Sequence, residues 1–313
     1  MSRARRTTGR HAVMVAVALL LVLAGCSSSG GDSGGGDRTD DGGTPSSGPS
    51  ATRTTGPATS APGRAPGGTP ASPSGGAKSA PAYWHPKAGT PWQWQLSGTV
   101  DTSVDVPVYD IDGFENGADV VRRLHAAGRK VICYINVGAW ESFRPDAKDF
   151  PASVRGDGDG WDGERWLDIR RIDVLRPLMA ARFDMCVKKG FDAVEPDLLD
   201  GYANTTGFPL TGGQQLAYNR MIASLAHERG LAVGLKNDVD QVTTLVKDFD
   251  FAVNEECAQY DECARMTPFI AAGKPVFHVE YKLKTGQFCP QARRLGLSSM
   301  VKHLSLDAWR DPC

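Results

Sequence analysis

Acidic and amide side chains follow a series of short apolar runs in the C-terminal three quarters of the chain. Their positions are Asp110, Asp112, Asn136, Glu195, Asp197, Asp200, Lys236, Asn237, Asp238, Asn254, Glu255, Glu256 and Glu280, with one lysine among them. Any single acid at such a place could be a helix cap or a solvated loop charge. The recurrence of polar groups after six separate runs indicates a shared site instead.

Paired carboxyl groups beside aromatic rings are what glycoside hydrolysis requires. One carboxylic acid protonates the departing oxygen, and a second carboxylate attacks the sugar or activates water. The two groups therefore need different pKa values. Aromatic rings can stack against sugars, and the candidates for that role are Trp92, Trp94, Tyr134, Trp140, Trp161 and Tyr202. Some of these rings could equally belong to the hydrophobic core.

The elements that must position these residues alternate between strand and helix. Apolar runs predict strands over 104–111, 130–137, 192–196, 232–236, 251–254, 275–279 and 298–302. Apolar residues at helical spacing predict helices over 117–127, 173–189, 213–229, 239–247 and 263–272. A glycine stands between a helix and the next strand at positions 128, 190, 230 and 273, as expected of helices that end in the left-handed conformation.

This alternation predicts an α/β fold of the (β/α)₈ TIM-barrel type. An eighth strand is expected at either 92–96 or 166–169. Such a barrel brings the C-terminal ends of its strands to one rim, where the chemistry lies. An open doubly wound sheet is the alternative, but no strand is followed by the Gly-rich loop that binds nucleotide phosphates in those folds.

Several segments of the chain resemble glycoside hydrolase family 114. They are 92–96, 131–135, 140–146, 164–169, 190–192, 234–238 and 253–257, and the resemblance extends from Tyr83 to Lys282. That family is described as endo-α-1,4-polygalactosaminidase and has a TIM-barrel-like domain. The resemblance therefore implies hydrolysis of internal bonds in an α-1,4-linked, partly deacetylated galactosamine polymer.

The resemblance also implies which residues act. The family's catalytic pair falls on Asp197 and Glu255, which we interpret as the nucleophile and the general acid/base of a retaining mechanism. Candidates for substrate binding are Trp92, Trp94, Asp110, Asp112, Tyr134, Trp140, Glu141, Arg144, Glu195, Asp200, Tyr202, Lys236, Asn237, Asn254, Glu280 and Tyr281. For Lys236 we expect pairing with a rim carboxylate rather than service as a catalytic base.

One segment departs from the family pattern. Members commonly read D-P-D-N-V-D where this chain reads Glu195-Pro196-Asp197-Leu198-Leu199-Asp200. The catalytic Asp is kept, but an amide side chain is replaced by leucine, which could change substrate contacts. Two alternatives therefore stay open. One is a non-catalytic, cell-surface polysaccharide-binding lipoprotein on a degenerated barrel, and the other is a hydrolase for another glycan.

The first 81 residues predict an export signal and a tether. Arginines precede an apolar run over 12–24 that is typical of secretory signals. The run ends in Leu23-Ala24-Gly25-Cys26, which resembles a bacterial lipobox. We expect residues 1–25 to be a signal peptide and Cys26 to carry lipid that anchors the protein to the outer face of the cell membrane, from which it could be released. Residues 26–81 are dominated by Gly, Ser, Thr and Pro and predict a disordered tether, which leaves 82–313 as the hydrolase domain.

The remaining cysteines predict disulfides. After Cys26 the chain holds six more, an even number in an exported domain. Six cysteines allow 15 connectivities. Our preferred pairs are Cys133 with Cys186, Cys257 with Cys263, and Cys289 with Cys313.

Charge and motifs restrict the partners. The formal net charge is -1, which argues against binding to nucleic acid through a positive field. Beyond residue 81 the acids outnumber the bases, so an acidic rim would favour a cationic aminosugar polymer. Neither the histidines nor the calcium-like stretch 156–164 has the residues that a zinc or EF-hand site needs. We expect no metal, no cofactor and a monomeric protein.

Overall fold

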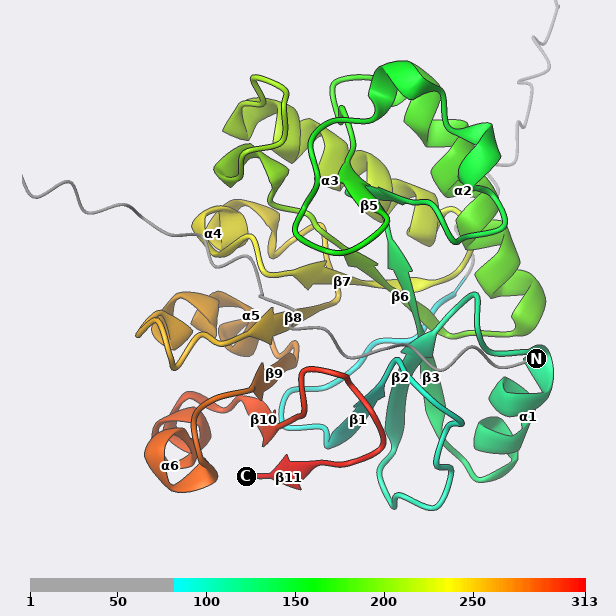
Figure 1. The fold of residues 1–313 in the computed structure, drawn as a ribbon. Helices are drawn as coiled ribbons and strands as arrows, with labels where there is room; N and C mark the ends of the chain where they lie inside the picture. Colours follow the sequence, from blue (N-terminus) through cyan, green and yellow to red (C-terminus); the bar gives the residue numbers. More distant parts are fainter. Residues whose placement is uncertain (1–81) are drawn as a thin grey trace, which may run out of the picture. The chain divides into compact units, whose positions relative to one another are not determined.

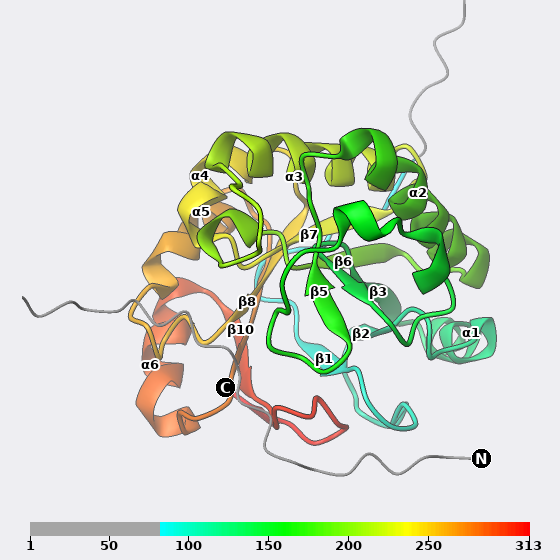
Figure 2. The same ribbon diagram turned by 45° about the horizontal axis from the view of Figure 1, so that its top comes forward.

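Eight parallel strands of the described residues, joined by a short antiparallel one, form a single curled sheet (Figure 1; Figure 2). The computed structural model describes residues 82–313, so the predicted signal peptide, Cys26 and the tether lie outside the described residues. In sheet order the strands are β1 (Trp92–Gln95), β2 (Val108–Asp112), β3 (Lys130–Asn136), β6 (Ala193–Asp197), β7 (Ala232–Lys236), β8 (Phe251–Glu255), β9 (Val276–Glu280), β10 (Ser298–Val301) and β11 (Asp311–Pro312).

Helices on the outside of the sheet connect these strands, as the alternating sequence pattern predicts (Figure 2). They are α1 (Ala118–Ala126), α2 (Ile172–Lys189), α3 (Gly212–His227), α4 (Val242–Leu245), α5 (Thr267–Ala271) and α6 (Thr285–Leu295). The four predicted stop glycines all have positive φ, and Gly190 at the end of α2 has φ of 90°. No helix among residues 82–313 is long and apolar enough to cross a membrane.

The two edges of the sheet meet, which makes the fold a barrel. The indole nitrogen of Trp92 in β1 donates to the carbonyl of Ser298 in β10 at 2.9 Å. Just beyond these strands, the backbone nitrogen of Leu96 donates to the carbonyl of Leu306 at 2.9 Å. The predicted TIM-barrel class is confirmed, and β1 is the eighth parallel strand that the sequence placed at either of two sites.

The other candidate for that strand belongs to an excursion from the barrel. β4 (Ala139–Glu141) and β5 (Glu164–Trp166) pair antiparallel after β3 and before α2, forming a separate two-stranded sheet. In Figure 2 this excursion lies over the opening of the barrel. The prediction that 166–169 could complete the barrel is therefore wrong, because Trp166 pairs locally with Ala139 and Leu167 bridges Arg155.

Side chains fill the inside of the barrel and the layer between sheet and helices. The inner group includes Trp92 and Trp94 from β1 with Phe251 and Phe277 from β8 and β9. Each of the two tryptophans is only 1% exposed. The expectation that they offer stacking faces to sugars is therefore wrong, because both rings point into the packed interior of the barrel.

Three disulfides link the described residues in the pairs that the sequence favoured. They join Cys133 to Cys186, Cys257 to Cys263 and Cys289 to Cys313. The last one ties the chain end to α6, a helix absent from our sequence prediction because Pro290 interrupts its pattern. Burial of Phe288 and Ala292 together with this covalent link offsets the poor helix propensity.

Candidate active site

Three neighbouring strands, β6, β7 and β8, bring three charged side chains together at the rim. The ammonium of Lys236, at the end of β7, lies 3.0 Å from Oδ1 of Asp197 and 3.3 Å from Oε2 of Glu255. It also lies 3.0 Å from Oε1 of Glu195, one layer deeper in β6. The predicted pairing of Lys236 with rim carboxylates is present.

Solvent exposure separates the members of this cluster. Lys236 and Glu195 are 2% and 0% exposed, whereas Asp197 and Glu255 are 17% and 27% exposed. A substrate that approaches the rim can therefore contact these two carboxylates but not the groups beneath them. They are the two that the sequence singled out as a catalytic pair.

Hydroxyl and amide groups also donate hydrogen bonds to both carboxylates. The Tyr134 hydroxyl donates to Oδ2 of Asp197 at 2.7 Å. The Tyr281 hydroxyl donates to Oε1 of Glu255, and Nδ2 of Asn237 donates to its Oε2 at 3.3 Å. Each carboxylate is thus oriented from two sides while one edge stays open to solvent.

Opposing effects act on the pKa of Lys236. Burial alone would lower it, because the charged ammonium is removed from water. The carboxylates of Asp197, Glu195 and Glu255 outweigh burial and raise the pKa well above its usual value. Lys236 is therefore a fixed cation, which makes a catalytic-base role for it untenable at neutral pH.

The residue after each of these strands adopts the left-handed backbone conformation. Leu198, Asn237 and Glu256 have φ of 60°, 48° and 60°. The turn after β6 lets the Leu198 nitrogen donate to Oδ1 of Asp197 at 2.9 Å. It also packs the chain against Gly138, where an added Cβ would lie 1.9 Å from the Leu198 carbonyl oxygen. The backbone beside Asp197 is therefore fixed by close packing.

Leu198 is strained in this conformation, and we expect Leu198→Asn to stabilise the fold. Asn tolerates positive φ far better than Leu, whose left-handed backbone costs on the order of 1 kcal/mol or more. The expected gain in the free energy of unfolding is about 0.5–1 kcal/mol, or about 1–4 °C in Tm. Leu199→Asn is the matched control, because Leu199 is fully buried and should lose stability. A fall in Tm for both variants would contradict strain at Leu198.

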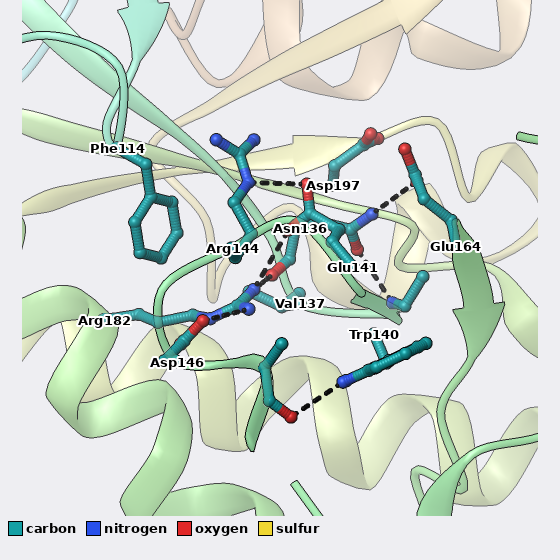
Figure 3. A network of polar contacts seen from close by, with 12 residues as sticks. Phe114, Asn136, Val137, Trp140, Glu141, Arg144, Asp146, Glu164, Arg182 and Asp197 are labelled. Carbon is teal, nitrogen blue, oxygen red and sulfur yellow. Dashed lines mark hydrogen bonds and ion pairs between the residues drawn. The ribbon is translucent and has the colours of Figure 1, made fainter. Parts of the chain in front are cut away.

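A second group of predicted binding residues forms a buried ion-pair network beside the cluster (Figure 3). The Arg144 guanidinium binds both oxygens of Asp112, at 3.1 and 2.7 Å, and Oε1 of Glu141 at 2.8 Å. Arg182 of α2 adds a contact to Glu141 at 3.4 Å and an ion pair with Asp146. Asp112, Glu141 and Arg144 are at most 6% exposed as side chains. They are tied up in this buried network and are not positioned to contact substrate directly, contrary to our expectation.

Two further predicted binding residues also point away from the rim opening. Glu280 is fully buried, where it accepts from the Ala258 backbone at 2.8 Å and contacts Nε2 of His278 at 2.9 Å. Asn254 is 1% exposed, and its Nδ2 lies 3.5 Å from Oδ1 of Asn237. The prediction of direct contact with substrate is wrong for both, because alternate residues of β8 and β9 face the helices.

The other candidates lie around the cluster. Half-buried Asp200 has its pKa raised to about 6 by burial and then by the charge of Asp197. Tyr202 is hydrogen-bonded to Asp238. Trp140 lies on β4 and donates to the Ala147 carbonyl at 2.9 Å, with Arg155 over its ring. Its ring is thus occupied on one face by protein.

Comparison with known sequences identifies the family. Residues 74–313 match glycoside-hydrolase family GH114. The chain belongs to this family. An uncharacterised protein of Deinococcus radiodurans is 30% identical to this GH114 hydrolase, with 69% of this chain and 81% of the relative covered.

Solved structures extend the comparison. One match is the crystal structure of Aspergillus fumigatus Ega3 in complex with galactosamine. Its sequence is 40% identical to this chain, and the TM-score is 0.71, with 74% of this chain and 98% of Ega3 covered. The glycoside hydrolase domain of PelA from Pseudomonas aeruginosa is 14% identical, with a TM-score of 0.54 over 70% of this chain and 96% of that domain. At that identity PelA shows likeness of fold alone.

The site of this GH114 hydrolase also contains an acidic pair, Glu164 and Asp159, that the sequence did not indicate. Glu164 of β5 lies beside Asp197, with one oxygen 3.4 Å from Nδ2 of Asn136 (Figure 3). Burial, followed by the charge of Asp159, raises the pKa of Glu164 to about 9. The pair comes from the β4–β5 excursion. The pattern of strands in the sequence does not indicate that this excursion lies over the barrel.

We expect Glu164→Gln to flatten the dependence of stability on pH. Because the folded-state pKa is raised, the folded protein holds a proton that the unfolded chain loses above about pH 4, so wild-type stability falls as pH rises toward about 9. The Gln variant lacks this proton. Its stability relative to wild type should rise by roughly 1 kcal/mol or more between pH 5 and pH 9, measured by urea unfolding. Exposed Asp162→Asn in the same loop is the control, and parallel curves for wild type and Glu164→Gln would contradict the prediction.

Proposed function

We propose that this hydrolase cleaves internal α-1,4 bonds of a galactosamine-containing polysaccharide, with Asp197 as nucleophile and Glu255 as general acid/base. The observation that carries the proposal is the arrangement around Lys236. Two carboxylates from separate strands share one buried ammonium, and both reach solvent. Asp197 is held from below by Lys236 and from the side by Tyr134.

The spacing of the two carboxylates is compatible with the retaining mechanism that we assign. Both contact the Lys236 nitrogen, so their nearer oxygens are at most about 6.3 Å apart, the sum of the two contact distances. Retaining glycosidases have carboxyl groups about 5–5.5 Å apart, and inverting ones about 6.5–9.5 Å to admit a water. This bound applies to the nearer oxygens, and the separation that retaining enzymes use lies within it.

The chemistry assigns each residue a step. Glu255 donates its proton to the glycosidic oxygen while a carboxylate oxygen of Asp197 bonds to the anomeric carbon and the carbon–oxygen bond breaks. The shortened chain leaves, and the other part stays bound to Asp197 as an ester. Glu255, now a carboxylate, takes a proton from water, whose oxygen displaces Asp197. Lys236 and Tyr134 keep the carboxylate of Asp197 oriented throughout.

Charge and similarity support an aminosugar substrate. Asp197, Glu255 and Asp200 gather acidic groups at the opening, which favours a polymer bearing ammonium groups. The related Ega3 binds galactosamine in its crystal structure, and this chain is 40% identical to it. The linkage follows from the family resemblance.

The proposal is tested by incubating the purified protein with partly deacetylated polygalactosamine and measuring new reducing ends and chain length. Internal cleavage predicts an early drop in chain length. Fully N-acetylated polymer and an uncharged galactan are the comparison substrates. Binding of the deacetylated polymer without turnover would favour the non-catalytic alternative, and turnover of another glycan alone would overturn the substrate assignment.

A further inference from the structure

A second pair of acids, Asp110 of β2 and Glu195 of β6, is buried beneath the catalytic carboxylates. Both residues are 0% exposed. Lys236 contacts Oε1 of Glu195 at 3.0 Å. Among the described residues no N–H or O–H group donates to the other Glu195 oxygen or to either oxygen of Asp110. Three buried acceptors without a donor are costly unless the carboxyl groups satisfy each other.

The two carboxyl groups contact each other at hydrogen-bonding distance. Two carboxylates cannot form such a bond, because neither has a hydrogen to donate. A single proton on one Asp110 oxygen supplies the donor for Glu195, leaves the other Asp110 oxygen as an uncharged carbonyl, and removes one of two buried like charges. The aspartic-protease dyad shares a proton in the same way.

We propose that Asp110 carries this proton and donates it to Glu195, which makes Asp110 a positioning residue for Lys236 and, through it, for Asp197. The ammonium of Lys236 faces Glu195, which favours the negative charge on Glu195 and the proton on Asp110. Burial, followed by the charge of Glu195, raises the pKa of Asp110 well above its usual value. The charged groups that act on Asp110 are Glu195, Lys236 and Asp197.

The proton on Asp110 affects how the positive charge of Lys236 is divided between Glu195 and Asp197. With Asp110 neutral, Glu195 and Lys236 form a deep pair of net charge zero, and the ammonium stays available to Asp197 at 3.0 Å. A charged Asp110 would add a second anion below Lys236 and draw the ammonium away from the rim. The kinetic consequence rests on the proposed function, whereas the protonation state does not.

Two replacements of Asp110 separate proton donation from charge and from simple packing. Asp110→Asn keeps a donor toward Glu195 without charge, so we expect kcat on the polymer within about threefold of wild type and an unchanged pH profile. Asp110→Leu fills similar space but removes the donor, so we expect kcat to fall 10- to 100-fold with little change in KM. Equal losses for both variants, or none for Leu, would overturn the proposal.

Infrared difference spectra test the proton directly and without activity. The difference spectrum of wild type minus Asp110→Asn at pH 7 should show the carbonyl band of one protonated carboxylic acid. This band should shift when the water is replaced by deuterium oxide. Absence of this band would overturn the proposal even where Asp110→Leu does not fold. If wild type fails to cleave the polymer but shows the band, the proposed function fails and the proton assignment stands.

Discussion

Asp197→Asn is expected to reduce kcat on the galactosamine polymer by about 10⁴-fold or more, because no covalent intermediate can form without the nucleophile. Glu255→Gln should lower kcat by roughly 10²- to 10⁴-fold, the usual contribution of a general acid/base. Both replacements keep the size of the side chain and its contact with Lys236, so KM should change little. Steady-state assays of new reducing ends give both values. Exposed Asp240→Asn, on the same side of the barrel, is the control.

Azide distinguishes the roles of the two residues. In Glu255→Ala, azide can replace the missing base and attack the covalent intermediate, so an activated aryl substrate should yield a glycosyl azide of retained configuration. In Asp197→Ala, azide can take the place of the nucleophile and should give the inverted product. Rescue with the opposite stereochemistry would exchange the two assignments. Activity of Asp197→Asn near that of wild type would contradict the catalytic pair itself.

The sequence located the strand ends well but not the direction of each side chain. Strands of a barrel are buried on both faces, so their apolar runs lack the alternation that marks an inner face. Trp92 therefore could not be distinguished from a surface ring, although it fills the barrel. Glu280 and Tyr281 are adjacent in sequence, yet Tyr281 contacts Glu255 while Glu280 binds backbone outside the barrel.

Long-range pairing of charges was predictable only where strand ends converge. Asp197, Lys236 and Glu255 end neighbouring strands, so the fold class alone brings them together. Glu164 approaches Asp197 from an excursion between β3 and α2, whose path depends on packing rather than on a repeated pattern. Arg144 likewise bridges Asp112 and Glu141 inside the protein, a choice of partner that charge and spacing do not determine.

Lys236→Met should impair both stability and activity. The replacement fits the space of the lysine stem but removes the cation that faces Glu195, Asp197 and Glu255. Breaking a buried ion pair on one side costs about 3–5 kcal/mol, because a charge stays buried without its partner. We expect a loss of this size in the free energy of unfolding at pH 8, together with a large fall in kcat.

The loss of unfolding free energy in Lys236→Met should become smaller as the pH falls. Without the ammonium, the pKa values of the neighbouring carboxyl groups rise in the folded state, so the folded variant binds protons that the unfolded chain has lost. Stability then decreases with rising pH between about 4 and the raised pKa, and the difference from wild type is smaller at pH 5 than at pH 8. Urea unfolding at both values measures this. Lys282→Met is the matched control, since Lys282 faces Glu256 but is 55% exposed. A deficit independent of pH would mean that lost packing, rather than three uncompensated carboxylates, explains the effect.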